Sequence, residues 1–195
     1  MGITLFIHQY LPLSNFAHII NQLPPIIQFI VMIFVGEIGY YFIHRMLHEI
    51  PFLWRFHAIH HSTEYLDWLA TTRFHFVDQI VAKVFQFLPL YLLQFPSYLL
   101  ELYVLWSASI AFFIHANIRF NFGILNYIFV TPNLHQWHHD RMITNVNYSA
   151  QLPVIDLIFK TWYLPDKVKP QEYGIKEKIP NNYLSQLIYP FFIKG

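Results

Sequence analysis

The sequence predicts an all-α integral membrane protein, built from one spanning helix plus a transmembrane helical hairpin. Of its 195 residues, 55% are hydrophobic and only 12% are charged, about half the charged share of an average globular protein. The chain contains three apolar stretches of about 20 residues, the length that crosses the roughly 30 Å hydrocarbon core of a bilayer. No Lys or Arg precedes the first stretch. A large soluble helical bundle is the alternative, and the hydropathy argues against it.

The three stretches define the predicted helices. Residues 23–43 form the spanning helix, and Pro24 and Pro25 suit its first turn. Residues 76–95 and 98–116 form the hairpin, which turns at Pro96. The second stretch carries Asp78, Gln79 and Lys83 near its start, so its apolar part is short for a span. We therefore expect the hairpin to turn inside or just past the bilayer.

The remaining segments complete a single domain of residues 1–195. Residues 1–22 are apolar without a basic start, which predicts an interfacial or extra membrane helix instead of a signal peptide. Residues 23–165 form the core with the functional residues. Residues 166–182 are charged and punctuated by proline, which predicts an exposed cytosolic segment. The tail after residue 182 is apolar again, and we expect it to rest on the membrane or on the core.

Charge and composition exclude several classes of protein. A net charge of +1 gives no sign of a nucleic-acid partner. Six scattered glycines form no phosphate-binding loop, and the lack of cysteine excludes disulfides, iron–sulfur clusters and thiolate chemistry. Under the positive-inside rule, the loops after the first and third stretches face the cytoplasm. A multi-pass bacterial inner-membrane protein is favoured over one of the endoplasmic reticulum.

The twelve histidines equal Lys and Arg in number, and ten of them follow a pattern. They form an HxxxH at the end of the first stretch, two HxxHH motifs, and single residues that precede and end the hairpin. Positions i, i+3 and i+4 share one helix face, so each motif points its imidazoles in one direction. The predicted topology brings all ten to one membrane face. These histidines are His44, His48, His57, His60, His61, His75, His115, His135, His138 and His139.

Clustered neutral imidazoles at this density indicate bound metal. One zinc ion takes four ligands, so ten candidates predict a cytosolic histidine-rich helical cap that holds a dinuclear metal site. The sequence has no HExxH zinc-peptidase motif and no Glu-x-x-His pair of the bundle di-iron type. If the chemistry is oxidative, iron is the expected ion. Either single histidine, His75 or His115, could instead make a hydrogen bond in the core.

Two divalent ions on neutral ligands carry about four positive charges, which a low-dielectric site must compensate. Four carboxylates near the motifs are candidates to balance charge or to orient imidazoles. Glu37, seven residues before His44, shares its helix face within the span, and an interhelical hydrogen bond is the equally supported alternative. Asp156 could equally cap a helix or turn. The four carboxylates are Glu37, Asp78, Asp140 and Asp156.

The histidine motifs resemble those of the fatty acid hydroxylase/sterol desaturase superfamily. The resemblance covers residues 40–165 and rests on HRMLH, LWRFHAIHH, RFH, HAN and LHQWHHD, followed by NYSAQLPVIDLIFKTWYLP. It implies a membrane di-iron oxygenase whose ligands include the eight histidines of the three motifs, with His75 and His115 as additional family histidines. Two motifs depart from the family pattern: Pro-x-Glu is here Phe76-Val77-Asp78, and Asn-Tyr-Gly is here Asn147-Tyr148-Ser149.

The resemblance implies an O₂-dependent lipid hydroxylase that acts on a fatty acyl, alkyl or sterol-like substrate. A desaturase of the same superfamily is the alternative, and a non-redox zinc enzyme or a metal-binding membrane protein is the second. The expected cofactors are two iron ions (Fe²⁺/Fe³⁺) with O₂ as co-substrate, and zinc could replace iron in a purified protein. Because the chain carries no flavin, nicotinamide or iron–sulfur motif, electrons must come from a separate cytochrome, ferredoxin or reductase.

Overall fold

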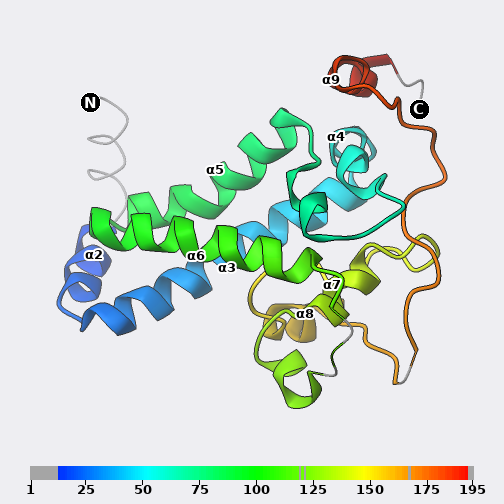
Figure 1. Ribbon diagram of the computed structural model, residues 1–195. Helices are drawn as coiled ribbons and strands as arrows, with labels where there is room; N and C mark the ends of the chain where they lie inside the picture. Colours follow the sequence, from blue (N-terminus) through cyan, green and yellow to red (C-terminus); the bar gives the residue numbers. More distant parts are fainter. Residues whose placement is uncertain (1–12, 119, 121, 167, 193–195) are drawn as a thin grey trace.

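The computed structural model describes residues 13–118, 120, 122–166 and 168–192 (Figure 1). All regular elements in this part of the chain are helical, which confirms the all-α prediction; one isolated bridge pairs Asp140 with Tyr173. The elements, in chain order, are α2 (Leu13–Asn21), α3 (Pro25–Glu49), α4 (Pro51–His61), η1 (Trp68–Thr72), α5 (Phe76–Leu92), α6 (Ser97–His115), η2 (Gly123–Tyr127), α7 (Pro132–His138), α8 (Val154–Phe159) and α9 (Tyr183–Phe192).

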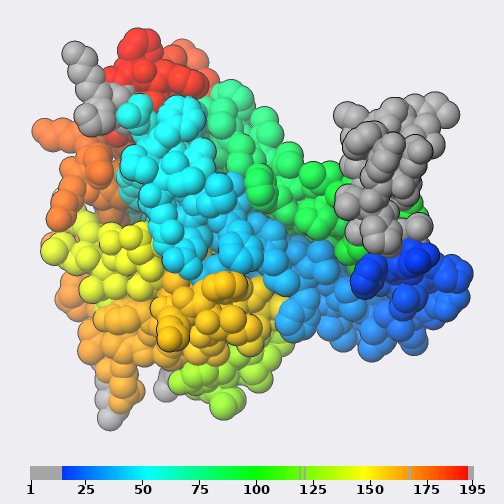
Figure 2. Space-filling view, turned by 180° about the vertical axis from the view of Figure 1, so that it is seen from behind, coloured from blue at the N-terminus to red at the C-terminus, as the bar shows by residue number. Residues whose placement is uncertain are grey.

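The helices α3, α5 and α6 form an arm, and α4, α7, α8 and α9 form a broader head at its end (Figure 1). The space-filling view from behind shows the same division, with the narrow arm on the right and the head on the left (Figure 2). The helix α3 runs from the arm into the head and carries the HRMLH motif in its last two turns. It ends at Ile50, whose backbone is extended, and Pro51 starts α4 directly afterwards.

The predicted hairpin is formed by α5 and α6, which are joined by residues 93–96. Gln94 adopts a left-handed conformation with a φ of 57° at this turn, and Pro96 precedes α6. Only α3 and α6, among the described helices, are long and apolar enough to cross a membrane. The helix α5 has 17 residues and a proline near its end, so it falls short of a full span, as its polar start predicts.

Two glycines allow the three helices of the arm to pack closely. A Cβ atom on Gly39 would collide with the backbone carbonyl of Phe85 in α5, and one on Gly36 would collide with the ring of Tyr103 in α6. Small residues at such crossings are typical of membrane helix pairs. This close packing buries the side chains of Met32, Leu90 and Tyr103 in the core of the arm.

The outer surface of the arm is apolar. Only 33% of the most apolar window of α3 and 22% of that of α6 is buried inside the protein. Large exposed side chains such as Ile30, Phe34 and Leu105 cover these faces. This surface carries few charged side chains, among them Glu101 of α6 and Lys83 of α5. A mainly apolar surface of this size is unfavourable in water and is suited to lipid, so the arm supports membrane association.

The N- and C-terminal segments pack at opposite ends. The helix predicted within residues 1–22 is present as α2 over residues 13–21, and residues 1–12 lie outside the described residues. Residues after α8 run along the head without a helix until α9. There Phe191 packs edge-on against Phe56 of α4. The tail therefore rests on the head, with an exposed apolar face of its own.

Candidate metal centre

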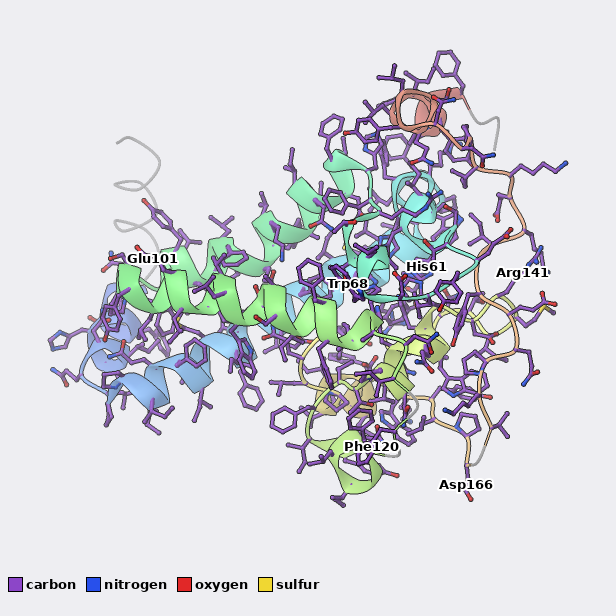
Figure 3. The ribbon with its side chains drawn as sticks, in the orientation of Figure 1. His61, Trp68, Glu101, Phe120, Arg141 and Asp166 are labelled. Carbon is purple, nitrogen blue, oxygen red and sulfur yellow. The ribbon has the colours of Figure 1, made fainter. Side chains whose placement is uncertain are left out.

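Nine of the ten patterned histidines form two adjacent groups inside the head. Within each group, one ring nitrogen of every member lies within 4.8 Å of those of all the others. His61 marks their place in Figure 3, at the end of the arm opposite to Glu101. The first group contains His44, His48, His57, His61 and His138, and the second contains His60, His115, His135 and His139.

Each HxxHH motif divides its histidines between the two groups. In α4, His57 and His61 join the first group and His60 joins the second. At α7 the division is reversed: His138 joins the first group, while His135 and His139 join the second. Residues i and i+4 lie one above the other on a helix and residue i+3 lies slightly to the side, so one helix can serve two neighbouring positions.

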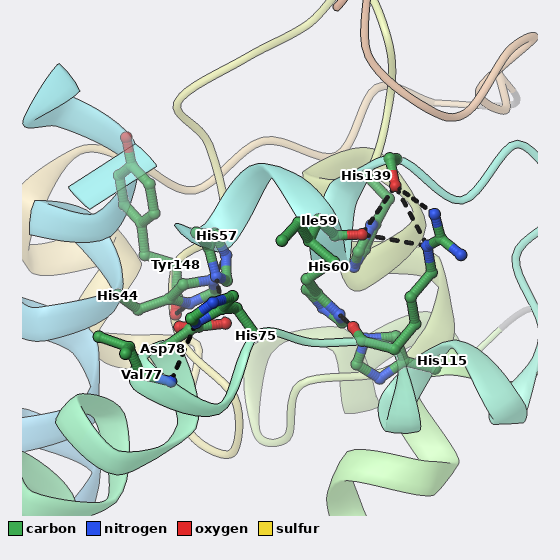
Figure 4. Close-up of polar contacts among 12 residues, drawn as sticks. His44, His57, Ile59, His60, His75, Val77, Asp78, His115, His139 and Tyr148 are labelled. Atoms are coloured by element: carbon green, nitrogen blue, oxygen red, sulfur yellow. Dashed lines mark hydrogen bonds and ion pairs between the residues drawn. The ribbon is translucent and has the colours of Figure 1, made fainter. Parts of the chain in front are cut away.

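The first group is held by hydrogen bonds from Nδ1. His44 donates from Nδ1 to the carbonyl of Tyr148 at 2.6 Å, and His138 donates to that of Val146 at 2.8 Å. His57 donates to the carboxylate of Asp78 at 3.1 Å (Figure 4). Since these acceptors require the proton on Nδ1, the Nε2 atoms of the three rings carry bare lone pairs.

The second group follows the same scheme. His60 donates from Nδ1 to the carbonyl of Arg73 at 3.0 Å, and His115 donates to that of Ala111 at 2.7 Å. The side chain of Arg73 donates in turn to Ile59 and Ser62 at the end of α4, which fixes the segment that supplies the carbonyl.

The arrangement of nitrogens fits bound metal ions. Nε2 of His44 lies 3.1 Å from Nε2 of His57, and the same distance separates Nε2 of His60 and His115. Each of these four rings has its proton on Nδ1, so both pairs bring lone pair against lone pair, which only a shared cation makes favourable. Ligands at right angles around an ion, with metal–nitrogen bonds of about 2.1 Å, lie about 3 Å apart.

Further ring nitrogens have no partner. They are buried and lack a hydrogen bond, a costly state for a polar atom unless it binds an ion. No carboxylate belongs to either group in the described part of the chain, so the donor set is imidazole alone. These unpartnered atoms are Nε2 of His48, His61 and His138 and Nδ1 of His135 and His139.

Burial also keeps the imidazoles uncharged. Loss of hydration lowers the pKa of His138 to about 3, and burial together with neighbouring histidines lowers the pKa values of His60, His61, His135 and His139 well below the usual value. A neutral imidazole is the form that binds metal. At neutral pH these side chains are therefore ready as ligands.

His75, predicted to be among the ligands, lies in neither group. Its Nδ1 accepts a hydrogen bond from the backbone N–H of Val77, which caps the start of α5 (Figure 4). Its Nε2 donates to the carbonyl of Leu187 in α9 at 3.1 Å. Both ring nitrogens are thus committed to the protein, because the residue occupies the turn before α5.

The four candidate carboxylates have different surroundings. Asp78 orients His57, as described above. Glu37 accepts hydrogen bonds from the backbone N–H groups of Ala150 and Gln151. Its role is therefore structural, but it joins α3 to the loop before α8 and not to another helix. Asp156 accepts from the N–H groups of Tyr148 and Ser149.

Asp156 therefore acts on the site indirectly, since it fixes the segment whose Tyr148 carbonyl binds His44. Asp140 accepts from the N–H groups of Met142 and Ile143 and forms a turn after the last motif. Of the four carboxylates, only Asp78 makes a hydrogen bond to one of the grouped histidines.

The loop over residues 140–153 contributes atoms that sequence reasoning missed. Its carbonyls at Val146 and Tyr148 fix His138 and His44. Asn147 holds the loop in a left-handed conformation with a φ of 53°, and its side chain donates to Leu134 and Tyr163. Asparagine is one of the residues that adopt this conformation most readily, so Asn147 is a feature of the sequence that could have indicated the loop's shape. The backbone carbonyls that fix the imidazoles have no such signature in the sequence.

Two cavities lead to the histidines from different sides. One, of about 260 Å³, lies between α5 and α6 and ends at His57, His60 and His115. Another, of about 390 Å³, is lined mostly by polar residues of the head and reaches His48, His61 and His138. A larger hollow of about 730 Å³ beside η2 contains none of the grouped histidines, so we do not associate it with the chemistry.

The chain matches the family model described as fatty acid hydroxylase over residues 29–161. It belongs to this family. The matched segment begins in α3, ends after α8 and contains both histidine groups. The family resemblance predicted from the histidine motifs is thus confirmed. No solved structure matches the chain.

Curated relatives are lipid-modifying enzymes. The chain is 37% identical to the ornithine lipid hydroxylase OlsE of Rhizobium tropici over 90% of its own length, and it spans 54% of that protein. It is 35% identical to the alkylglycerol monooxygenase of Homo sapiens over 66% of its length and 30% identical to that of Xenopus tropicalis over 75%. The chain spans about a third or less of these monooxygenases.

Proposed function

We propose that this protein is a membrane-bound lipid hydroxylase that uses O₂ and two iron ions held by the nine grouped histidines. The observation that carries the proposal is the pairing of bare Nε2 atoms 3.1 Å apart in each group. The names of the curated relatives, a lipid hydroxylase and two monooxygenases, support oxygen insertion over desaturation. They likewise support a lipid substrate.

Two bound iron ions would supply the activation of O₂ and the oxidation of an unactivated C–H bond. The protein's own contribution is to hold the ligand nitrogens in place and to keep water out. The hydrogen bonds from Nδ1 to Asp78 and to backbone carbonyls fix the ring orientations before any ion binds. Such preorganisation lowers the cost of binding and of reaction.

The cavity between α5 and α6 is the proposed substrate site. It connects the arm, which supports membrane association, with His57, His60 and His115. Apolar and small residues such as Ala82, Ala108 and Ala111 form much of its wall. A lipid could therefore pass from the bilayer to the histidines without crossing water.

Electrons are proposed to come from a separate cytochrome, ferredoxin or reductase. We place the histidine groups on the cytoplasmic side of a bacterial inner membrane, with α3 and the α5–α6 hairpin in the bilayer. The second cavity is lined by charged residues such as Arg141, Lys176 and Glu177 and reaches three histidines of the first group. The donor would approach closest to the metal here.

Substitution of one histidine from each group tests the proposal. We expect His60→Ala and His138→Ala to lose bound iron and to produce no oxidised lipid, because each removes a ligand from a different group. His18→Ala is the matched control, since His18 is exposed, belongs to neither histidine group and forms a hydrogen bond with Gln22. Metal analysis of the purified protein and lipid mass spectra of expressing cells give the readouts.

A product with one added oxygen atom would support the hydroxylase, and a product that has lost two hydrogen atoms would indicate the desaturase instead. Turnover retained in either variant would contradict the assignment. Four imidazoles in the second group also suit a zinc ion. Zinc as the native metal, with no O₂ consumption, would replace the proposal with a non-redox enzyme.

A further inference from the structure

The substrate cavity contains a cation that the proposed chemistry does not use. Lys83 lies on the same face of α5 as Gln79, Ala82 and Gln86, and all four residues line the cavity. Lys83 is the one Lys or Arg among the residues that form this wall. Its neighbours on the outer face of α5 are the exposed apolar side chains of Ile80 and Val84.

Lys83 has no carboxylate partner in the described part of the chain. Its ammonium donates to Oε1 of Gln86 at 2.9 Å and lies 5.6 Å from the ring centre of Phe87. Asp78, the carboxylate of the same cavity, binds His57. Lys83 itself is exposed, beside the apolar side chains of the arm surface. An ammonium group that faces lipid is costly without an anion.

A network of buried hydrogen bonds orients the side chain of Lys83. Gln86 is 2% exposed, and while its oxygen accepts from Lys83, its Nε2 donates to the hydroxyl of Tyr103. Gln151 donates to the same hydroxyl and to Glu37. Glu37 is therefore occupied by other donors, and Gln86 holds the ammonium at the cavity wall.

We propose that Lys83 binds an anionic group of the lipid substrate, a carboxylate or a phosphate, and so selects anionic lipids. An ammonium has three N–H donors, and Gln86 uses one of them. The proposal rests on the proposed function for the identity of the cavity as a substrate site. It adds a substrate class to that function.

The location also restricts where the lipid is oxidised. Lys83 follows Asp78 by five residues, about 7.5 Å of helix rise, and Asp78 contacts His57 at the inner end of the cavity. The cavity volume of about 260 Å³ holds only part of a lipid. An anion at Lys83 therefore brings the polar end of the lipid, and not the far end of an acyl chain, close to the histidines.

Binding of matched amphiphiles tests the role of Lys83. We would measure equilibrium binding of radiolabelled dodecanoate, dodecyl phosphate and dodecanol to the full chain in phosphatidylcholine nanodiscs, and subtract binding to empty nanodiscs. The wild type should prefer one or both anions over dodecanol by about tenfold or more, because a hydrogen bond between two charged groups is stronger than one to an uncharged hydroxyl. A preference for one anion identifies the group.

Lys83→Gln should reduce this preference to about one, and Lys83→Arg should preserve it. Lys178→Gln is the matched control, because Lys178 is exposed on the polar segment before α9. The ratio is taken within each variant, so partial loss of folded protein does not affect it. An equal affinity for dodecanol and both anions in the wild type, or an unchanged preference in Lys83→Gln, would overturn the proposal.

The binding ratio does not depend on turnover. Anion preference through Lys83 in a protein that oxidises no lipid would therefore contradict the hydroxylase and support the anion site. Oxidised lipids that lack any anionic group, found in cells expressing the wild type, would contradict the anion site and leave the hydroxylase intact.

Discussion

The position of one proton decides what each imidazole in the head can bind. Five rings donate a hydrogen bond from Nδ1–H to an acceptor within the protein, and four of those acceptors are backbone carbonyls. Carbonyls cannot accept a proton at any ordinary pH, so this tautomer is fixed by the fold. Nε2 is consequently the nitrogen that each of these five rings offers to a metal ion.

His75 shows the opposite arrangement, since both of its nitrogens are used by the protein. We expect His75→Ala to retain the bound metal of the wild type but to lose about 1 kcal/mol of stability, the usual value of a helix cap. His75→Asn should restore most of that stability, because asparagine is an effective cap. Metal content and thermal unfolding are the measurements, and loss of metal in both variants would assign His75 to the ligands after all.

At the scale of the helices, the approach of α3 to α5 sets the geometry of the first histidine group. The same two helices carry His44 and His48 on one side and Asp78, the partner of His57, on the other. Gly39 permits this approach, because its Cα faces the carbonyl of Phe85 directly. A side chain at this position would push the helices apart.

We therefore expect Gly39→Val to destabilise the protein by about 1–3 kcal/mol, the typical cost of overpacking, and to weaken metal binding. Ile38→Val is the control, since Ile38 is exposed on the outer face of α3. Thermal unfolding and metal titration measure both effects. Wild-type stability in Gly39→Val would show that the two helices tolerate a wider separation.

The long helices and the clustering histidines could be predicted from the sequence. The division of these histidines between two groups could not. Apolar runs and prolines such as Pro25 and Pro96 placed α3, α5 and α6, and histidine spacing identified the nine grouped residues. The spacing of HAIHH is the same whichever group each histidine joins. The division depends on how α4 and α7 face each other, which is a tertiary relation.

His75 could not be separated from the ligands for a similar reason. Its sequence position before α5 suits a cap and a ligand equally, and only the distance to the other histidines decides. Lys83 was visible as a charge within an apolar stretch. That it lines the same cavity as His57 depends on the packing of α5 against α3 and α4.

At the scale of the molecule, the arm and the head divide the contacts with lipid and with water. The apolar surface of α3 and α6 suits a bilayer, and the head carries the charged segment before α9. The orientation proposed above places residue 178 in the cytoplasm and residue 22, between α2 and α3, on the opposite side.

Single cysteines can test this orientation without a background, because the chain contains none. We expect Gln22→Cys to react with a membrane-impermeant maleimide added outside intact spheroplasts, and Lys178→Cys to react only after the membrane is opened. Both positions are exposed, so accessibility within the protein does not limit the reaction. The reverse pattern would place the histidines on the outer side.

The crossed use of α4 and α7 also affects how the centre can change over evolutionary time. A shift or rotation of either helix moves nitrogens of both groups at once, because each helix supplies histidines to both. A change in the geometry of one histidine group therefore also changes the geometry of the other. Among proteins that share this fold, we expect sequence variation in the arm and its cavity, and we expect the two histidine groups to be kept or lost together.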